Sequence, residues 1–103
     1  MNIGIDIEEC SRFVNMRVMQ KIFSAGELEY IKQRHNACET IAWLYCAKEA
    51  YGKAMGLGIM KSRLTEIEIA HDQNGKPYYK NDPKASLSIS HTKTTAVAVC
   101  IIQ

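Results

Sequence analysis

Hydrophobic and polar residues alternate over the first eight positions of the chain. Every second side chain from position 3 is an isoleucine, so these residues share one side of an extended strand: Ile3, Ile5 and Ile7. The other side carries Gly4, Asp6 and Glu8. We expect the isoleucine side to pack on the core, so that the opposite side presents two carboxylates two residues apart.

Helical patterns follow this strand. We expect a short helix or turn over residues 9–19, with Phe13, Val14 and Met16 as its apolar residues. A second helix is expected to begin after Ser24, because Ser24 and Glu27 have the spacing of a capping box.

The longest helix is expected over residues 37–55, with Asn36 as its N-cap and Glu39 three residues on. Its apolar positions have helical spacing: Trp43, Cys46, Ala47, Ala50 and Ala54. Gly56 and Gly58 predict where this helix stops.

The second half of the chain has the pattern of strands. Residues 65–70 alternate, and the Asn-Gly pair at 74–75 is a strong hairpin signal, with a return strand expected from 78. Residues 86–90 alternate again, and residues 95–102 are apolar and β-branched, as in a buried strand. The order of elements predicts an α+β fold with a mainly antiparallel sheet packed on one long helix.

The length and composition limit the classes of protein that remain. The chain has 103 residues, which suits a single domain over 1–103. A net charge of +2 argues against nucleic acid as the partner. None of the four cysteines forms a C-x2-C pair, which argues against a zinc site. No apolar stretch approaches the roughly 18 residues of a membrane span, and no signal peptide is visible, so we expect a cytoplasmic protein.

The first candidate for chemistry is the pair of carboxylates on the first strand. Asp6 and Glu8 project on the same side and could share a hard divalent cation, since Mg2+ prefers a few carboxylate oxygens together with phosphate and water. The alternative is a solvated strand face, on which acidic pairs are common.

The second candidate lies on the long helix. Glu49 and Lys53 are four residues apart and share a face with Gly52 and Gly56, where a phosphate could approach the backbone closely. The alternative is a surface ion pair. Glycines inside a helix cost about 1 kcal/mol each relative to alanine, which favours a functional need or a fraying helix end.

Two further segments could contribute to an anion site. Ser90, His91 and Thr92 end a strand and could donate hydrogen bonds to an anion, although a polar turn is the alternative. A Ser-His-Asp triad is disfavoured there, because neighbours on a strand point to opposite faces. Pro77, after the turn at 74–76, could offer an apolar wall to an adenine ring. Together, these groups suit a Mg2+-diphosphate ligand.

Four blocks of sequence resemble the holo-acyl-carrier-protein synthases, a family of 4'-phosphopantetheinyl transferases. The blocks are GIDI at 4–7, AKEAYGKAMGLGI at 47–59, DQNGKP at 72–77 and SISHT at 88–92. They occur in the order and approximate spacing of that family, and the resemblance spans nearly the whole chain.

The resemblance implies a phosphopantetheinyl transferase fold that assembles as a homotrimer, with active sites between neighbouring chains. It implies Mg2+-dependent transfer of the 4'-phosphopantetheine group from coenzyme A to a serine of apo acyl carrier protein, with release of 3',5'-ADP. The pathway it implies is fatty acid biosynthesis. A non-catalytic module that binds a carrier protein or a nucleotide on the same fold is the alternative.

The resemblance also assigns residues to roles. Asp6 and Glu49 match the metal-binding carboxylates, and Glu8 is a further candidate ligand, because an Asp-x-Glu pattern is similar to that of the larger transferases of secondary metabolism. Asp6, Glu49 and Lys53 are the implied catalytic residues, and Glu49 is the candidate base. Coenzyme A contacts are expected from the following residues: Lys48, Lys53, Gly56, Pro77, His91 and Thr92. Arg12 matches a basic position that faces the acidic carrier protein.

One departure from the family pattern concerns phosphate binding. Many members have an arginine four residues before the lysine of the K-E-A motif, whereas this chain has Leu44. The resemblance therefore leaves open a different affinity for coenzyme A or a different choice of its derivatives.

Overall fold

The computed structural model describes residues 1–14, 19–57 and 61–103, the last range with side chains from Leu64 onward. The elements follow in this order: β1 (Asn2–Glu9), two short 3-10 helices (Cys10–Phe13 and Met19–Lys21), α1 (Ala25–Lys32), α2 (Ala37–Ala54), a third 3-10 helix (Lys61–Glu66), β2 (Ile69–His71), β3 (Pro77–Tyr79), β4 (Ser86–His91) and β5 (Thr95–Ile102). The expectations for Met16 and Gly58 lie outside the described residues.

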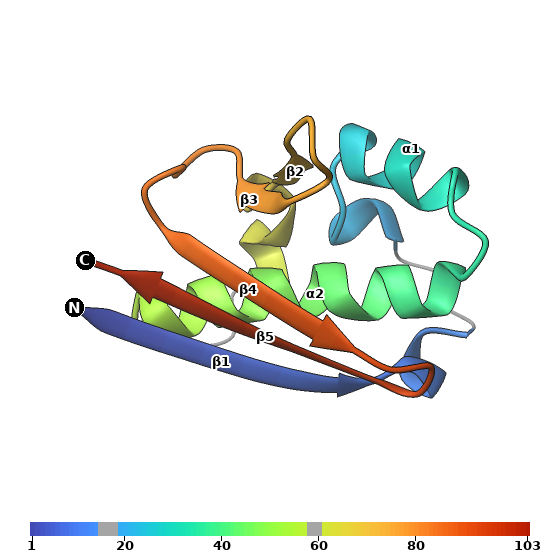
Figure 1. The fold of residues 1–103 in the computed structure, drawn as a ribbon, viewed down its shortest axis with the longest axis horizontal. Helices are drawn as coiled ribbons and strands as arrows, with labels where there is room; N and C mark the ends of the chain where they lie inside the picture. The colour runs from blue at the N-terminus through green and yellow to red at the C-terminus, as the bar shows by residue number, and fades with distance from the viewer. Residues whose placement is uncertain (15–18, 58–60) are drawn as a thin grey trace.

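A three-stranded antiparallel sheet and the long helix α2 form the centre of the molecule. The strands lie in the order β1-β5-β4, and α2 packs against β1 and β5 across one face of this sheet (Figure 1). α1 and the antiparallel β2–β3 hairpin pack beside α2. The α+β arrangement expected from the sequence is confirmed. No helix in the described ranges has the length and apolar character needed to cross a lipid bilayer.

The helix α2 is buried on all sides along its middle. Every residue from Thr40 to Ala50 is buried, including Lys48 and Glu49. The expected bounds of this helix are confirmed to within one residue. It ends in a Schellman motif, in which Leu57 N–H donates to the carbonyl of Gly52, and Gly56 at φ +72° supplies the left-handed residue.

The side of β1 that faces the core is the opposite of the one expected. Ile3, Ile5 and Ile7 are 58%, 56% and 65% exposed, whereas Gly4 and Asp6 are buried against α2. A Cβ atom at Gly4 would lie 1.9 Å from the carbonyl oxygen of Ala50. The close approach of the two backbones therefore decides which side of β1 turns inward, and the isoleucines remain on the outer face of the sheet.

The expected helix caps differ in outcome. The capping box of α1 is confirmed: Ser24 Oγ accepts from Glu27 N–H, and a Glu27 carboxylate oxygen accepts from Ser24 N–H. Asn36 occupies the N-cap position of α2, but its side chain makes no capping hydrogen bond. The N-cap position expected for Asn36 is therefore confirmed, without the side-chain bond of a capping box. Glu39 lies near His91, with Oε1 3.4 Å from the His91 Nδ1 atom.

The strand expected over residues 65–70 is shorter than its alternating pattern predicts. Residues Lys61–Glu66 form a 3-10 helix, and β2 begins only at Ile69. The carbonyl oxygens of Leu64 and Ile67 accept hydrogen bonds from the Lys48 ammonium, and Leu64 O also accepts from Ile67 N–H, a local turn bond formed in place of strand pairing. The turn expected at 74–75 is confirmed, with Gly75 at φ +85°.

Candidate active site

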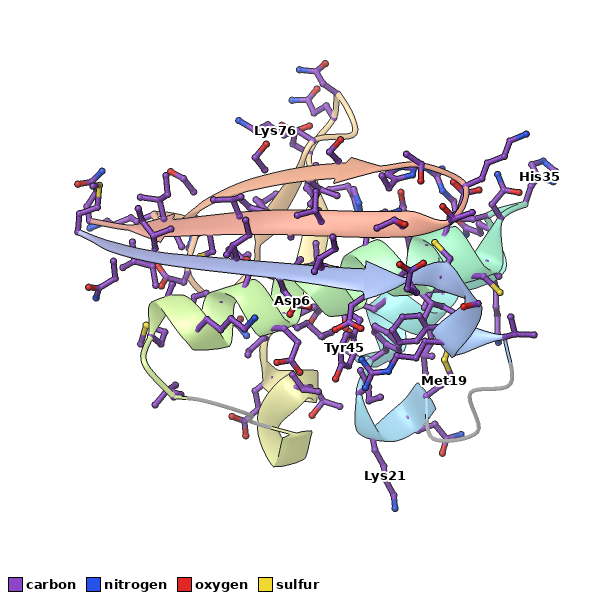
Figure 2. The ribbon with its side chains drawn as sticks, turned by 90° about the horizontal axis from the view of Figure 1, so that it is seen from below. Asp6, Met19, Lys21, His35, Tyr45 and Lys76 are labelled. Atoms are coloured by element: carbon purple, nitrogen blue, oxygen red, sulfur yellow. The ribbon has the colours of Figure 1, made fainter. Side chains whose placement is uncertain are left out.

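A buried carboxylate from β1 meets a cation from α2. Asp6 is 9% exposed, and its Oδ1 atom lies 3.0 Å from Lys53 Nζ, which also donates to the carbonyl of Ile5 at 2.9 Å. The other carboxylate oxygen, Asp6 Oδ2, is buried and has no hydrogen-bond partner. Figure 2 shows Asp6 between β1 and α2. This unpaired oxygen is in the interior, where it lacks both a protein donor and bulk water.

Glu49 lies one helical turn before Lys53 and is also 9% exposed. One turn earlier still, Tyr45 is buried beside it, on the side of α2 where Figure 2 shows Asp6. Burial, aided by the adjacent Glu49 carboxylate, raises the pKa of Tyr45 to about 12. The phenol is therefore protonated at neutral pH and can donate a hydrogen bond toward Glu49.

Glu8 and Arg12 form an ion pair at the end of β1. The Arg12 guanidinium also lies over the rings of Phe13 and Tyr45, at 5.7 and 5.2 Å from their centroids. Burial raises the pKa of the Glu8 carboxyl; its bond to Arg12 acts in the opposite direction, and the neighbouring Asp6 carboxyl raises it further. The pair links the acidic site to the first 3-10 helix.

The donor set suits a hard divalent cation. Carboxylate oxygens such as those of Asp6 and Glu49 are ligands that Mg2+ prefers. The Asp6 Oδ2 atom has no hydrogen-bond partner and is therefore free to act as such a ligand. Among the described residues, no three acidic, histidine or cysteine side chains are already gathered as a metal cluster. Glu8 in particular is paired with Arg12, so its predicted role as a third ligand would require this pair to open.

A second candidate region lies at the opposite edge of the sheet. A cavity of about 370 Å³ is walled by α1, α2, the β2–β3 hairpin and β4. Its lining includes Pro77 and His91, two of the predicted coenzyme A contacts, together with Lys76. A smaller neighbouring cavity of about 250 Å³ shares His91, Arg34 and Trp43 with it. The structure thus brings the predicted nucleotide contacts Pro77 and His91 together.

The two regions are separated within one chain. Asp6 pairs with Ala98 of β5, and His91 pairs with Ala96 of the same strand from the other side. β5 therefore lies between them, and α2 packs over its small residues. A diphosphate ligand that used both regions would have to pass around a helix about 10 Å wide, unless the two halves came from different chains.

Lys48 does not fit its predicted role as a coenzyme A contact. Its side chain has no exposed surface, and its ammonium lies 2.6 Å from Glu27 Oε1. The prediction for Lys48 is therefore wrong, because a ligand cannot reach this group in the interior. Gly56 has a structural role in the helix stop, and the Thr92 hydroxyl accepts hydrogen bonds from Thr94 and Thr95 in the β4–β5 turn. Their predicted ligand contacts stay predictions.

Sequence reasoning missed the aromatic wall of the larger cavity. Tyr30 stacks on His71 with ring centroids 4.1 Å apart, and Trp43 packs edge-on against both rings. The Arg34 guanidinium lies over Tyr30 at 4.7 Å. These residues come from separate parts of the chain, and no short motif contains them. Only the sequence order of α1, α2 and the hairpin could have indicated that they meet.

Leu44, the departure from the family pattern, is fully buried in the core. Position 44 therefore reaches neither cavity in this chain. The cations that do line the larger cavity are Arg34 and Lys76, with His91 beside them.

Comparisons with known proteins agree with this geometry. The model of the 4'-phosphopantetheinyl transferase superfamily matches residues 2–101. A holo-[acyl-carrier-protein] synthase of Treponema denticola is 35% identical, with 100% of this chain and 98% of the relative covered. The corresponding synthase of Caldicellulosiruptor bescii is 38% identical, with 99% and 97% covered.

Solved structures extend the similarity to three dimensions. A holo-(acyl-carrier-protein) synthase from Bacillus anthracis, solved in complex with CoA (3',5'-ADP), matches with a TM-score of 0.84 and 38% identity, covering 96% of this chain and 92% of that one. The synthase from Neisseria meningitidis matches with a TM-score of 0.81 and 28% identity, covering 96% and 94%. The chain belongs to the 4'-phosphopantetheinyl transferase superfamily, as one of its holo-[acyl-carrier-protein] synthases.

Proposed function

We propose that this chain transfers the 4'-phosphopantetheine group of coenzyme A to a serine of apo acyl carrier protein. The observation that carries this proposal is the buried Asp6 carboxylate with one unpaired oxygen, bonded to Lys53 from the helix that also carries Glu49. A buried acidic group beside a cation suits a metal-assisted reaction of a diphosphate. Full-length similarity to holo-[acyl-carrier-protein] synthases supports the same reaction.

The reaction is a displacement at the β-phosphorus of coenzyme A. The serine oxygen of the carrier forms a bond to this phosphorus, and the bond from the phosphorus to the oxygen bridging the two phosphates breaks. The product 3',5'-ADP leaves with that oxygen, and the serine proton passes to a base. Glu49 is our proposed base, because it is a buried carboxylate on the same helix as Lys53, one turn away from it.

Asp6 and Glu49 would hold Mg2+, which neutralises negative charge on the diphosphate when bound. Lys53 adds a second positive charge at the same place and is half-exposed, so its ammonium can turn from Asp6 to a phosphate oxygen. Glu8 could join as a third ligand once it leaves Arg12. The residues at the other edge of the sheet, Pro77 and His91, would receive the nucleotide end.

The outer face of the sheet supports a homotrimer. Ile3, Ile5 and Ile7 are largely exposed on it, and the outward residues of β5 continue the apolar surface. An exposed apolar surface made by three alternate residues on one face of a strand is typical of an interaction site. If assembly also brought the Asp6 region of one chain to the His91 region of its neighbour, the two regions that β5 separates within one chain would form a single site. A cytoplasmic location, where coenzyme A and carrier proteins meet, is part of the proposal.

The test of the function is a mass measurement. The purified chain, coenzyme A, Mg2+ and apo acyl carrier protein are incubated, and the carrier is expected to gain about 340 Da, the mass of one phosphopantetheine group transferred at its serine. Chelation of Mg2+ with EDTA is expected to abolish the gain, and added Mg2+ to restore it. A carrier that binds without gaining mass would favour the non-catalytic alternative.

A second prediction concerns the carrier surface. Arg12 has a side chain 53% exposed at the end of β1, so it can reach an acidic partner. Arg12→Glu is expected to raise the Michaelis constant for the carrier about tenfold or more, because rim charges steer and orient charged partners. The constant for coenzyme A should change little. Lys21→Glu makes the same charge change on another exposed segment and is the control; equal effects of both variants would contradict docking at Arg12.

A further inference from the structure

Two opposite charges are completely buried between α1 and α2. The side chains of Lys48 and Glu27 have no exposed surface, and their charged atoms lie 2.6 Å apart. The Lys48 ammonium also donates to the carbonyl oxygens of Leu64 at 2.8 Å and of Ile67 at 2.7 Å. All three of its donor hydrogens therefore have an acceptor, as a buried ammonium requires.

The Glu27 carboxylate is equally occupied. One oxygen accepts from Ser24 N–H at 2.9 Å in the capping box of α1. The other accepts from Ile69 N–H at 2.8 Å, where β2 begins. One ion pair thus joins four segments: the start of α1, the middle of α2, the 64–67 segment and the first residue of the hairpin.

The elements joined by this pair also wall the larger cavity. α1 contributes Tyr30, α2 contributes Trp43, and the β2–β3 hairpin contributes His71, Lys76 and Pro77. The stacking of Tyr30 on His71 joins α1 to the hairpin inside that cavity. A small shift of any one of these elements would change the positions of the groups that face the nucleotide.

Stability alone is a poor explanation for the pair. Apolar residues of similar volume often replace a buried ion pair with no loss of stability. The hydrogen bonds of Lys48 and Glu27, in contrast, have fixed directions and fix the backbone at Leu64, Ile67 and Ile69. Such directional contacts are what a binding site needs from the residues that support it.

We propose that Lys48 and Glu27 are positioning residues, which hold α1, α2 and the β2–β3 hairpin in the geometry that binds the nucleotide end of coenzyme A. This inference rests on the proposed function. Lys48 touches no ligand itself and acts through the carbonyls of Leu64 and Ile67. Its sequence neighbour Glu49 belongs to the acidic site, on another side of α2. The adjacent residues Lys48 and Glu49 would therefore serve the nucleotide region and the acidic site, respectively.

The test is the double variant E27Q/K48M. It removes both charges together, so no unpaired charge is left inside, and the amide oxygen of the new side chain can still accept one of the two backbone hydrogen bonds. Trp43 is the single tryptophan of the chain and lines the cavity, so its fluorescence follows the binding of 3',5'-ADP directly. We expect the dissociation constant for 3',5'-ADP and the Michaelis constant for coenzyme A to rise about tenfold, with kcat changed less than about threefold.

A matched control removes an equivalent pair from the surface. Lys80 and Glu68 lie 3.7 Å apart near the same hairpin, but their side chains are 58% and 24% exposed. The variant E68Q/K80M is expected to keep wild-type affinity. Circular dichroism and thermal unfolding establish that each variant is folded at the temperature of the assay.

The outcomes separate the inference from the proposed function. A wild-type chain that binds neither coenzyme A nor 3',5'-ADP would remove the proposed function. A wild-type chain that binds, with a folded double variant of equal affinity, would overturn the positioning role alone. A parallel fall in kcat and in the affinity for the carrier would also overturn it, as a general structural effect. If the double variant does not fold, E27D decides, because it keeps both charges but shortens the reach of the carboxylate to Ser24 and Ile69 by one methylene: about threefold weaker nucleotide binding supports the inference, and unchanged binding overturns it.

Discussion

Replacing Asp6 by asparagine, or Glu49 by glutamine, is expected to lower the transfer rate by about a thousandfold or more with the fold unchanged. Each substitution removes one of the two carboxylates that would hold Mg2+ and leaves a neutral amide of nearly the same size. Asp6→Asn also removes the partner of the Lys53 ammonium. A loss of this size corresponds to about 4 kcal/mol of transition-state stabilisation, at about 1.4 kcal/mol per factor of ten.

The measurement compares initial rates of carrier modification with binding of Mn2+, followed by electron paramagnetic resonance. Both variants are expected to bind the ion more weakly, so the loss of rate has an independent readout. Glu9→Gln provides the matched control, because Glu9 is the last residue of the same strand and is exposed, outside the buried acidic site. A near-normal rate in D6N or E49Q, or an equally large loss of rate in E9Q, would remove the metal-binding assignment.

The part of the fold that the sequence predicts well is the part with local signals. The helix α2 has apolar residues at helical spacing and a glycine at its end, and both of its bounds agree with the prediction to within one residue. The hairpin turn follows from Asn74-Gly75, and the outward serines of β4 follow from strict alternation. In each case, residues within one turn or one strand are enough to specify the geometry.

The orientation of β1 shows where local signals fail. Hydrophobic alternation predicts that the isoleucines face the core, but a backbone contact made by Gly4 with Ala50, far along the chain, decides the opposite. The alternation therefore separates the two faces of the strand correctly but does not say which face turns inward. In the homotrimer that we propose, the outward isoleucines would be covered by a neighbouring chain, and their apolar character would serve a surface between molecules.

The predicted active-site residues also differ in how far the sequence determines their position. Asp6, Glu49 and Lys53 follow from a family resemblance, and the contact from Lys53 to Asp6 depends on the packing of β1 against α2. Lys48 is adjacent to Glu49 in sequence and belongs to the same motif, yet it points into the interior because successive helical residues differ by about 100° in direction. Its partner Glu27 lies on another helix, where the capping pattern explains only one of its contacts.

The largest effect on assembly is expected from Ile5→Lys. Ile5 is 56% exposed in the single chain, at the centre of the outward row of β1. If this face is the interface of a homotrimer, a lysine there would place an unpaired ammonium inside it, which costs several kcal/mol for each chain. We expect a monomer by light scattering and a rate reduced about a hundredfold or more, because each site would lose the half supplied by its neighbour.

Gln20→Lys adds the same charge at an exposed position on the side of the molecule away from the sheet, where Figure 2 shows its neighbours Met19 and Lys21. It is expected to remain trimeric and active.

Mixing of two inactive variants supplies the deciding comparison. Chains carrying Asp6→Asn and chains carrying His91→Ala, each inactive alone, are mixed in equal amounts and allowed to exchange. They should together recover about a quarter of the wild-type rate, since one interface in four then combines an intact Asp6 with an intact His91. Such recovery is impossible if each chain carries a whole site. A monomeric I5K variant with a normal rate, or mixtures without recovery, would show that one chain is sufficient and that its exposed isoleucines serve another contact.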